Sequence, residues 1–244
     1  EPLPRWAFSC YFRKDGESVW RNPELIADTD TPYGHGTPEA EAFVRALSER
    51  LGINEKYIVP GFEDVYYYLW RERKLPVNVD PFDSKLESPE ERARLRRIFE
   101  QGLKSTVGFA LPLQANWERD QLRWGSGPWF LRDERMYLIP GDSPMGYRLP
   151  LDSLPWTILE ERNGLFPRDP MAPRPQLPTR RQLGEPTPGM VGAGRGHELP
   201  RAPGPGESAA GMVRTALCVE ARGGIVRVFM PPLALLEEYL DLVA

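Results

Sequence analysis

Residues 140–156 read PGDSPMGYRLPLDSLPW, and the path of this stretch decides how the segments on either side of it can be arranged. Its four prolines fix φ and its two glycines allow positive φ, so its backbone is specified almost residue by residue. An extended strand over Gly146–Asp152 would place Arg148 and Asp152 on one side, opposite the apolar side chains. The stretch is then either a rigid connection whose Asp and Ser side chains cap turns, or a polar lip beside a binding cleft.

Length and composition predict a soluble globular protein with one large domain, or one domain and a fragment. The chain has 244 residues, of which 41% are hydrophobic and 27% charged. A net charge of −4 argues against nucleic acid or an anionic membrane as the partner. Neither a signal peptide nor an apolar run of the roughly 18 residues that a membrane helix needs is found. Two cysteines make no disulfide framework, which favours a reducing, cytoplasmic location.

Alternating and turn-forming residues predict several strands. Arg5–Arg13 alternates and is followed by an Asp-Gly turn, and Cys10 lies on its apolar side. Val213–Met230 is the clearest hairpin, with Gly223-Gly224 as its turn. Further strand-like stretches are Thr106–Leu113, Trp129–Leu131 and Met136–Ile139.

Four helices are predicted from their end signals and apolar spacing. The first begins at Thr37-Pro38 and stops at Gly52, and the second covers Glu63–Lys74. The third begins with a capping box of Ser88 and Glu91 and stops at Gly102, and the last carries the apolar stripe Leu233, Leu236, Leu240 and Val243. Together with the strands, they predict an α+β fold with a largely antiparallel sheet and helices packed against it.

One long segment interrupts this pattern. Pro167–Met212 contains 10 prolines and 8 glycines among 46 residues and no aromatic residue. Such a segment cannot bury enough apolar surface to offset the entropy lost on ordering, so it is predicted to be a flexible insertion. Residues 1–166 then form the first part of the α+β domain, and the hairpin and helix of residues 213–244 complete the same sheet.

Two groups of side chains could carry chemistry, one on the last predicted hairpin and one between the second and third predicted helices. Arg214 and Glu220 share one face of the last hairpin, and its register sets Glu220 directly across from Arg227. This register predicts a cross-strand salt bridge between Glu220 and Arg227. Asn78, Asp80 and Asp83 could hold magnesium or calcium, or serve turns and caps.

A cysteine-protease site is disfavoured. It would need Cys10 or Cys218 together with His35 or His197, and both cysteines lie in apolar strand contexts. A reactive thiolate needs a basic neighbour and access to solvent.

Several runs together resemble a large bacterial family of unknown function. The strongest is GDSPMGYRLPLDSLPW, and four others agree in order: LPRWAFSCY from Leu3, LPVNVDP from Leu75, VRTALCVE from Val213, and FMPP from Phe229. The resemblance covers nearly the whole chain except the Pro/Gly-rich stretch after residue 166. Members of the family usually follow a transglutaminase-like, cysteine-protease-like domain in very long polypeptides.

The resemblance implies an ATP-dependent amidoligase with a glutamine-synthetase-like fold, joining a carboxylate to an amine on a small-molecule or peptide substrate. It implies ATP and magnesium as cofactors, with Arg148, Asp152 and Arg214 as candidates for binding substrate or nucleotide and Glu220 as a candidate metal ligand. The family's most ligase-like motifs, a Gly-Gly-Glu-Pro phrase and an Asn-His phrase, are absent from these residues. The chain is therefore expected to be a fragment that is not catalytic alone. The alternative is a peptide-binding or scaffolding module that serves the upstream transglutaminase-like domain.

Overall fold

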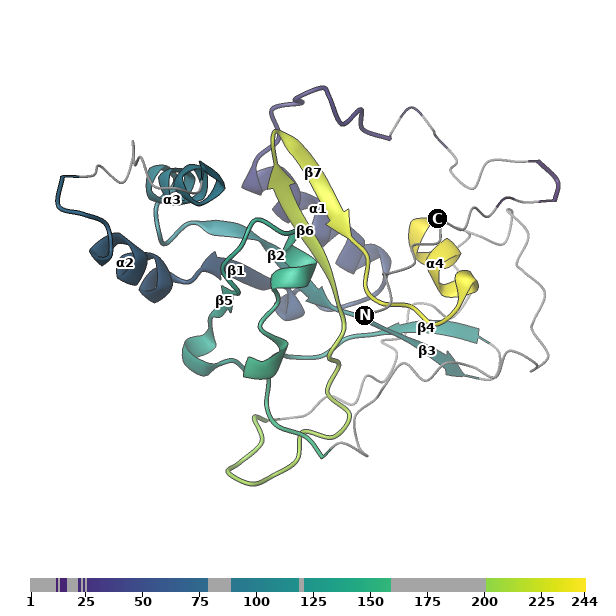
Figure 1. The fold of residues 1–244 in the computed structure, drawn as a ribbon. Coiled ribbons are helices and arrows are strands. Elements are labelled where there is room, and N and C mark those ends of the chain that lie inside the picture. Colours follow the sequence, from purple (N-terminus) through teal and green to yellow (C-terminus); the bar gives the residue numbers. More distant parts are fainter. Residues whose placement is uncertain are drawn as a thin grey trace, which may run out of the picture.

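The computed structural model describes residues 26–78, 89–118, 121–158 and 201–244, with a few isolated positions before residue 26. It confirms an α+β fold with a mostly antiparallel sheet (Figure 1). The helices are α1 (Thr37–Arg50), α2 (Val65–Arg73), α3 (Pro89–Gln101) and α4 (Leu236–Val243). The strands are β1 (Val59–Glu63), β2 (Thr106–Pro112), β3 (Gln114–Glu118), β4 (Gln121–Gly125), β5 (Met136–Leu138), β6 (Ala216–Arg222) and β7 (Ile225–Phe229). Short 3₁₀ turns are η2 (Glu55–Tyr57), η3 (Arg132–Glu134), η4 (Met145–Arg148) and η5 (Leu151–Ser153).

Five strands form the main sheet in the order β5-β1-β2-β6-β7, and β3 and β4 form a separate hairpin. Neighbouring strands of the main sheet are antiparallel except β1 and β5, which are parallel. The predicted hairpin at Gly223-Gly224 is confirmed, and both glycines have positive φ, as a two-residue hairpin turn of type I′ requires. Because β6 pairs with β2, the last part of the chain belongs to the same sheet as the first.

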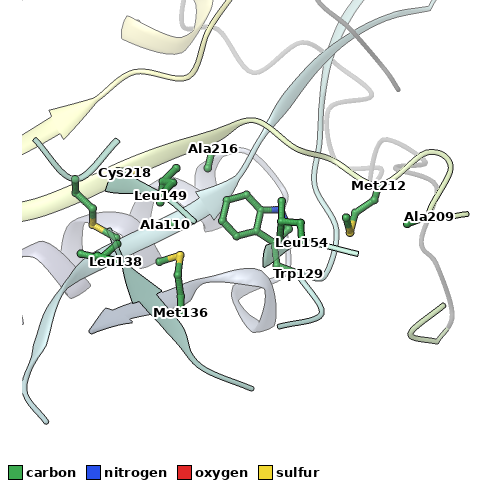
Figure 2. Close-up of a cluster of buried hydrophobic side chains, with 11 residues drawn as sticks. Ala110, Trp129, Met136, Leu138, Leu149, Leu154, Ala209, Met212, Ala216 and Cys218 are labelled. Atoms are coloured by element: carbon green, nitrogen blue, oxygen red, sulfur yellow. The ribbon is translucent and has the colours of Figure 1, made fainter. Parts of the chain in front are cut away.

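Both faces of the central strands are buried. On one face, α1 packs against β2 and β6, where Leu217 and Val219 join its core. On the other face, irregular segments and 3₁₀ turns cover Ala216 and Cys218 (Figure 2). The buried members of this second cluster are Ala110, Trp129, Met136, Leu138, Met145, Leu149, Leu154, Ala209, Met212, Ala216 and Cys218.

Local signals explain where the helices begin and end. Glu39 accepts a hydrogen bond from the Gly36 N–H at 2.6 Å in the first turn of α1. Asp64 caps α2 by accepting from the Tyr67 N–H at 3.1 Å. Gly52 and Gly102 follow α1 and α3 with φ of +67° and +89°, as predicted for helix stops. Within the described ranges, every helix is too short or too polar to span a bilayer.

Three sequence predictions differ from the structure. Trp129–Leu131 is not a strand, and the Trp129 indole instead donates to the Val213 carbonyl at 2.7 Å. Gly146–Asp152 is not extended, because 3₁₀ turns η4 and η5 occupy it. The end of the predicted insertion is also corrected, because Ala209 and Met212 are buried in the core.

Other predictions concern residues outside the described ranges. They are the strand over residues 5–13 with Cys10, the carboxylates Asp80 and Asp83, the cap residue Ser88, His197, and the insertion up to residue 200.

Candidate functional site

A row of glycines and one glutamate crosses the face of the sheet that carries Cys218. Gly61 in β1 lies opposite Gly108 in β2, and Gly108 lies opposite Glu220 in β6. The two glycines make room for the fully buried side chain of Met145. A Cβ atom on Gly61 would lie 2.9 Å from its Cε, and one on Gly108 would lie 2.8 Å from its Sδ. Residues 140–156 can therefore approach the sheet closely only because these two positions lack side chains.

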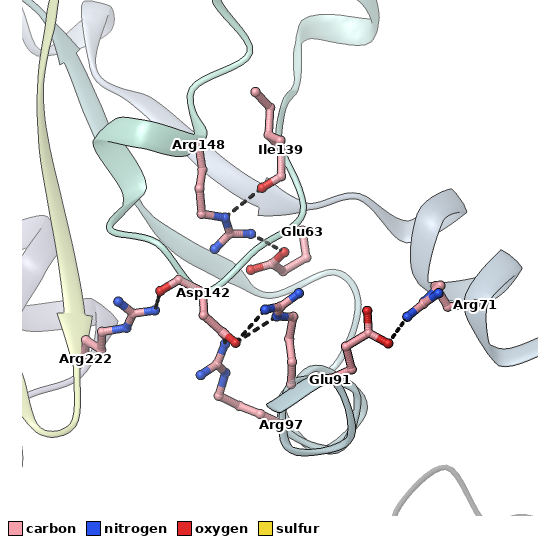
Figure 3. A network of polar contacts seen from close by, with 9 residues as sticks. Glu63, Arg71, Glu91, Arg97, Ile139, Asp142, Arg148 and Arg222 are labelled. Atoms are coloured by element: carbon pink, nitrogen blue, oxygen red, sulfur yellow. Dashed lines mark hydrogen bonds and ion pairs between the residues drawn. The ribbon is translucent and has the colours of Figure 1, made fainter. Parts of the chain in front are cut away.

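Two buried glutamates hold the η4 turn at its two ends. Glu220 accepts a hydrogen bond from the Met145 N–H at 3.2 Å. Glu63, at the end of β1, accepts from Nη2 of Arg148 at 2.6 Å, and Nε of Arg148 donates to the Ile139 carbonyl at 2.7 Å (Figure 3). The side chains of Arg148 and Glu63 are 4% and 8% exposed, so water screens this ion pair little.

Asp142 lies between arginines from two different elements. One carboxylate oxygen accepts from Nε and Nη2 of Arg94 at 2.9 and 2.7 Å, and the other accepts from Nη2 of Arg97 at 2.6 Å. The guanidinium of Arg222, the last residue of β6, donates to the main-chain carbonyl of Asp142 (Figure 3). Arg94 and Arg97 share a face of α3 because they are three residues apart. Asp142 and these three arginines are called the arginine cluster below.

The arginine cluster is reachable from solvent. The side chains of Arg94, Arg97 and Asp142 are 20%, 50% and 37% exposed. Burial alone would raise the pKa of Asp142, but the hydrogen bonds and positive charges of Arg94 and Arg97 outweigh it and hold that pKa below its ordinary value. Asp142 is therefore ionised at neutral pH, and three guanidinium groups against one carboxylate leave the cluster positively charged.

Tyr68 in α2 places a buried hydroxyl near the Glu63–Arg148 pair. The side chain is 2% exposed, and its hydroxyl makes no hydrogen bond of normal geometry with a described residue. Burial, and then the negative charge of Glu63, raises the pKa of Tyr68 far above its ordinary value. The hydroxyl is therefore neutral and cannot act as a base at physiological pH.

Arg148 and Asp152 do not share one side of a strand, so the predicted polar lip is wrong in its geometry. Arg148 is buried against Glu63, whereas Asp152 is exposed on η5. A 3₁₀ turn rotates successive side chains by about 120° instead of alternating them. The described stretch provides an anchor to the sheet at Arg148 and a solvent-exposed carboxylate at Asp152.

Arg214 and Glu220 bind different partners and do not form one site. Arg214 precedes β6, and its guanidinium donates to the Pro155 carbonyl. Glu220 lies opposite Arg227 in the predicted register, but its carboxylate is buried against the Met145 N–H while Arg227 is exposed. In this described hairpin no ion pair joins Glu220 to Arg227, so the predicted cross-strand salt bridge is not formed.

The donor set around Glu220 does not fit magnesium. Nowhere in the described ranges do three or more His, Cys, Asp or Glu side chains gather closely enough to hold a metal ion. Magnesium prefers an octahedral shell of oxygen ligands, and one oxygen of Glu220 is already hydrogen-bonded to the backbone. As to nucleophiles, burial and the nearby charge of Glu220 raise the pKa of the Cys218 thiol to about 12, so this thiol is unreactive at neutral pH.

The sequence prediction missed most residues of the cluster. Arg94 and Arg97 occupy an arginine-rich helix whose charged side chains all resemble a solvated face. Asp142 belongs to a stretch interpreted as a rigid connection with turn caps or as a polar lip, and Glu63 was predicted at the start of a helix. The only local signal was the spacing of Arg94 and Arg97, which places them on one face of α3.

A family model described as "Putative amidoligase enzyme (DUF2126)" matches residues 1–244. The chain belongs to this family. No curated protein and no solved structure matches the chain. Family membership and the arginine cluster are therefore the two independent observations that bear on function.

Proposed function

We propose that this chain forms the carboxylate-binding part of an ATP-dependent carboxylate–amine ligase and that it is not catalytic alone. The family supplies the reaction class. The observation that supports a site is the binding of both Asp142 oxygens by Arg94 and Arg97. Paired guanidinium groups recognise carboxylate and phosphoryl groups through charge-assisted hydrogen bonds of fixed geometry.

The proposed chemistry gives one role to Arg94 and Arg97 and another to the buried Glu63–Arg148 pair. ATP supplies the phosphoryl group that activates a substrate carboxylate toward the amine. Arg94 and Arg97 orient that carboxylate and balance its charge. The buried Glu63–Arg148 pair and the η4 turn hold the loop that faces these arginines. Magnesium ligands come from residues other than those around Glu220, which do not fit the ion.

The wider proposal follows the resemblance. The segments on both sides of the Pro/Gly-rich stretch, with Ala209 and Met212 included in the core, form one glutamine-synthetase-like domain in a cytoplasmic protein with a transglutaminase-like domain upstream. The pairing of β6 with β2 supports a single domain.

Because this chain is proposed not to be catalytic alone, amino-acid-dependent release of ADP is measured in the long polypeptide that carries the upstream transglutaminase-like domain. The assay contains ATP, magnesium and mixed amino acids as carboxylate and amine donors. Arg97→Gln is expected to lower turnover at least about tenfold, because it removes a charged hydrogen bond to the carboxylate. Arg96→Gln is the matched control, because the neighbouring Arg96 pairs with Glu100 at 2.7 Å and is 60% exposed. Absence of amino-acid-dependent ADP release from the wild type, or an equal rate in Arg97→Gln, would contradict the proposal.

A second function, peptide binding by strand addition, is favoured by the position of β7. In the described sheet, β7 is an edge strand that pairs with β6, and its residues Arg227 and Val228 are exposed. An exposed strand edge can accept an extended peptide through main-chain hydrogen bonds. Peptide binding that is independent of nucleotide would favour this scaffolding module over the ligase.

A further inference from the structure

Asp142 binds Arg94 and Arg97 in the way that an external anion would. All three side-chain hydrogen bonds that it accepts from these residues come from α3, while Asp142 itself lies in the loop between β5 and η4. One guanidinium binds each oxygen, so the pair matches any anion that presents two oxygens on one side. The observed occupant is the chain's own carboxylate.

The loop around Asp142 is held by contacts that do not involve the carboxylate. Arg222 donates to the main-chain carbonyl of Asp142, and Glu220 fixes the Met145 N–H three residues later. Rotation of the Asp142 side chain alone would therefore free both arginines of α3. The side chain is 37% exposed, so its carboxylate can leave the two arginines without unfolding of the loop.

We propose that Asp142 is an internal competitor that occupies an anion site formed by Arg94 and Arg97 and is displaced by a carboxylate or phosphoryl group of the substrate. The identity of that substrate rests on the proposed ligase function, whereas the anion site itself does not. A tethered carboxylate competes at an effective concentration in the millimolar range, so it excludes weakly bound anions until the substrate's other contacts add affinity.

Rescue of a truncated side chain by a small anion tests this site in the intact protein. Asp142→Ala is expected to lower the melting temperature, and sodium acetate is expected to restore it in a concentration-dependent way relative to sodium chloride of equal ionic strength. The acetate dissociation constant of this variant should be at least about tenfold lower than that of the wild type. Inorganic phosphate in a parallel series distinguishes a phosphoryl site from a carboxylate site. Asp142→Ser replaces the alanine variant if the latter does not fold.

Two controls make the test decisive. Asp152→Ala removes an exposed carboxylate from the same stretch and should show no specific response to either anion. Adding Arg97→Gln to Asp142→Ala should abolish the response. The proposal that Asp142 is an internal competitor would be overturned by either of two results. One is an anion-dependent rise in the melting temperature of Asp142→Ala no larger than that of Asp152→Ala, and the other is a rise that persists when Arg97→Gln is added. Anion rescue without amino-acid-dependent ADP release would instead leave the site intact and refute the ligase.

Discussion

Glu63 and Glu220 are two buried carboxylates on one sheet face that are satisfied in different ways. Glu63 pairs with the guanidinium of Arg148, whereas Glu220 accepts a main-chain hydrogen bond from Met145. A buried carboxylate that loses its partner costs much more free energy than an exposed one. The η4 turn therefore depends on single residues that lie far from it in the sequence.

Replacing Arg148 should destabilise the fold strongly. Arg148→Met leaves Glu63 buried without a cation, and we expect a loss of about 3–5 kcal/mol in the free energy of unfolding. Denaturant titration measures it, with Asp152→Asn as an exposed control expected to change by no more than about 0.5 kcal/mol. Equal stabilities of the two variants would show that the buried pair contributes little.

A single methyl group should disturb the contact between η4 and the sheet. In Gly108→Ala the new Cβ would lie 2.6 Å from the Val219 carbonyl oxygen and 2.8 Å from Sδ of Met145. The main-chain oxygen cannot move without disturbing the β2–β6 pairing, so we expect a loss of about 1–3 kcal/mol. Gly127→Ala is the matched control, because nothing lies within 4 Å of its Cβ position. Thermal unfolding of both variants compares them, and a harmless Gly108→Ala would contradict the close packing.

Among the secondary-structure elements, α4 is attached to the β3–β4 hairpin by two indole groups. Trp117 donates to Glu238 and Trp124 donates to Asp241, each at 2.8 Å. Burial raises the pKa of Asp241, and the hydrogen bond from Trp124 opposes this only in part. The contact therefore includes a carboxylate whose ionised form is disfavoured by burial, at some cost to stability.

Asp241→Asn should relieve that cost while keeping an oxygen acceptor for the Trp124 indole. The pKa of Asp241 is higher in the folded state than its unfolded value of 3.8. Protonation of Asp241 therefore adds to the free energy of unfolding of the wild type below pH 3.8, and this contribution is lost as the pH rises through the folded-state pKa. We expect the variant to be at least as stable as the wild type at pH 7, with a difference that shrinks as the pH falls through that window. Unfolding free energies at several pH values measure it. If the stability of the variant relative to the wild type were lower at pH 7 than at acid pH, the prediction would be contradicted.

At the scale of the whole molecule, one sheet joins segments from both ends of the chain. β1, β2 and β5 precede the Pro/Gly-rich segment, and β6 and β7 follow it. β6 lies between β2 and β7 with both faces buried, so it cannot leave the sheet without exposing the core. The two halves are held together by strand pairing and by the two hydrophobic clusters.

Cleavage of the connection between the halves should therefore leave the fold assembled. The flexible insertion stays a prediction, and its arginines at 168, 180, 181 and 195 make it cleavable by trypsin. We expect brief trypsin treatment to cut there first, and the two fragments to elute together in size-exclusion chromatography because β6 remains paired with β2. First cuts within α1 or α3, or separation of the fragments without denaturant, would contradict this expectation.

Most elements, but few site contacts, could be predicted from the sequence. Gly52 and Gly102 marked helix ends, and Gly223-Gly224 marked a hairpin turn, because each signal acts on its immediate neighbours. The β1 strand was missed, and Glu63 was assigned to α2 instead, because its partners lie elsewhere in the chain. The contacts that define the site join residues between 45 and 85 positions apart.

The sequence by itself determined an α+β protein, the β6–β7 hairpin, the C-terminal ends of α1 and α3, and membership of the family described as "Putative amidoligase enzyme". Only the tertiary structure decided that residues 140–156 fold into 3₁₀ turns over the sheet. It also decided that Arg148 forms an ion pair with Glu63 and that Asp142 forms ion pairs with Arg94 and Arg97 of α3. The physical reason is range: backbone propensity and side-chain periodicity act over a few residues. The charge, burial and close approach that form this site depend on which distant segments the sheet brings together.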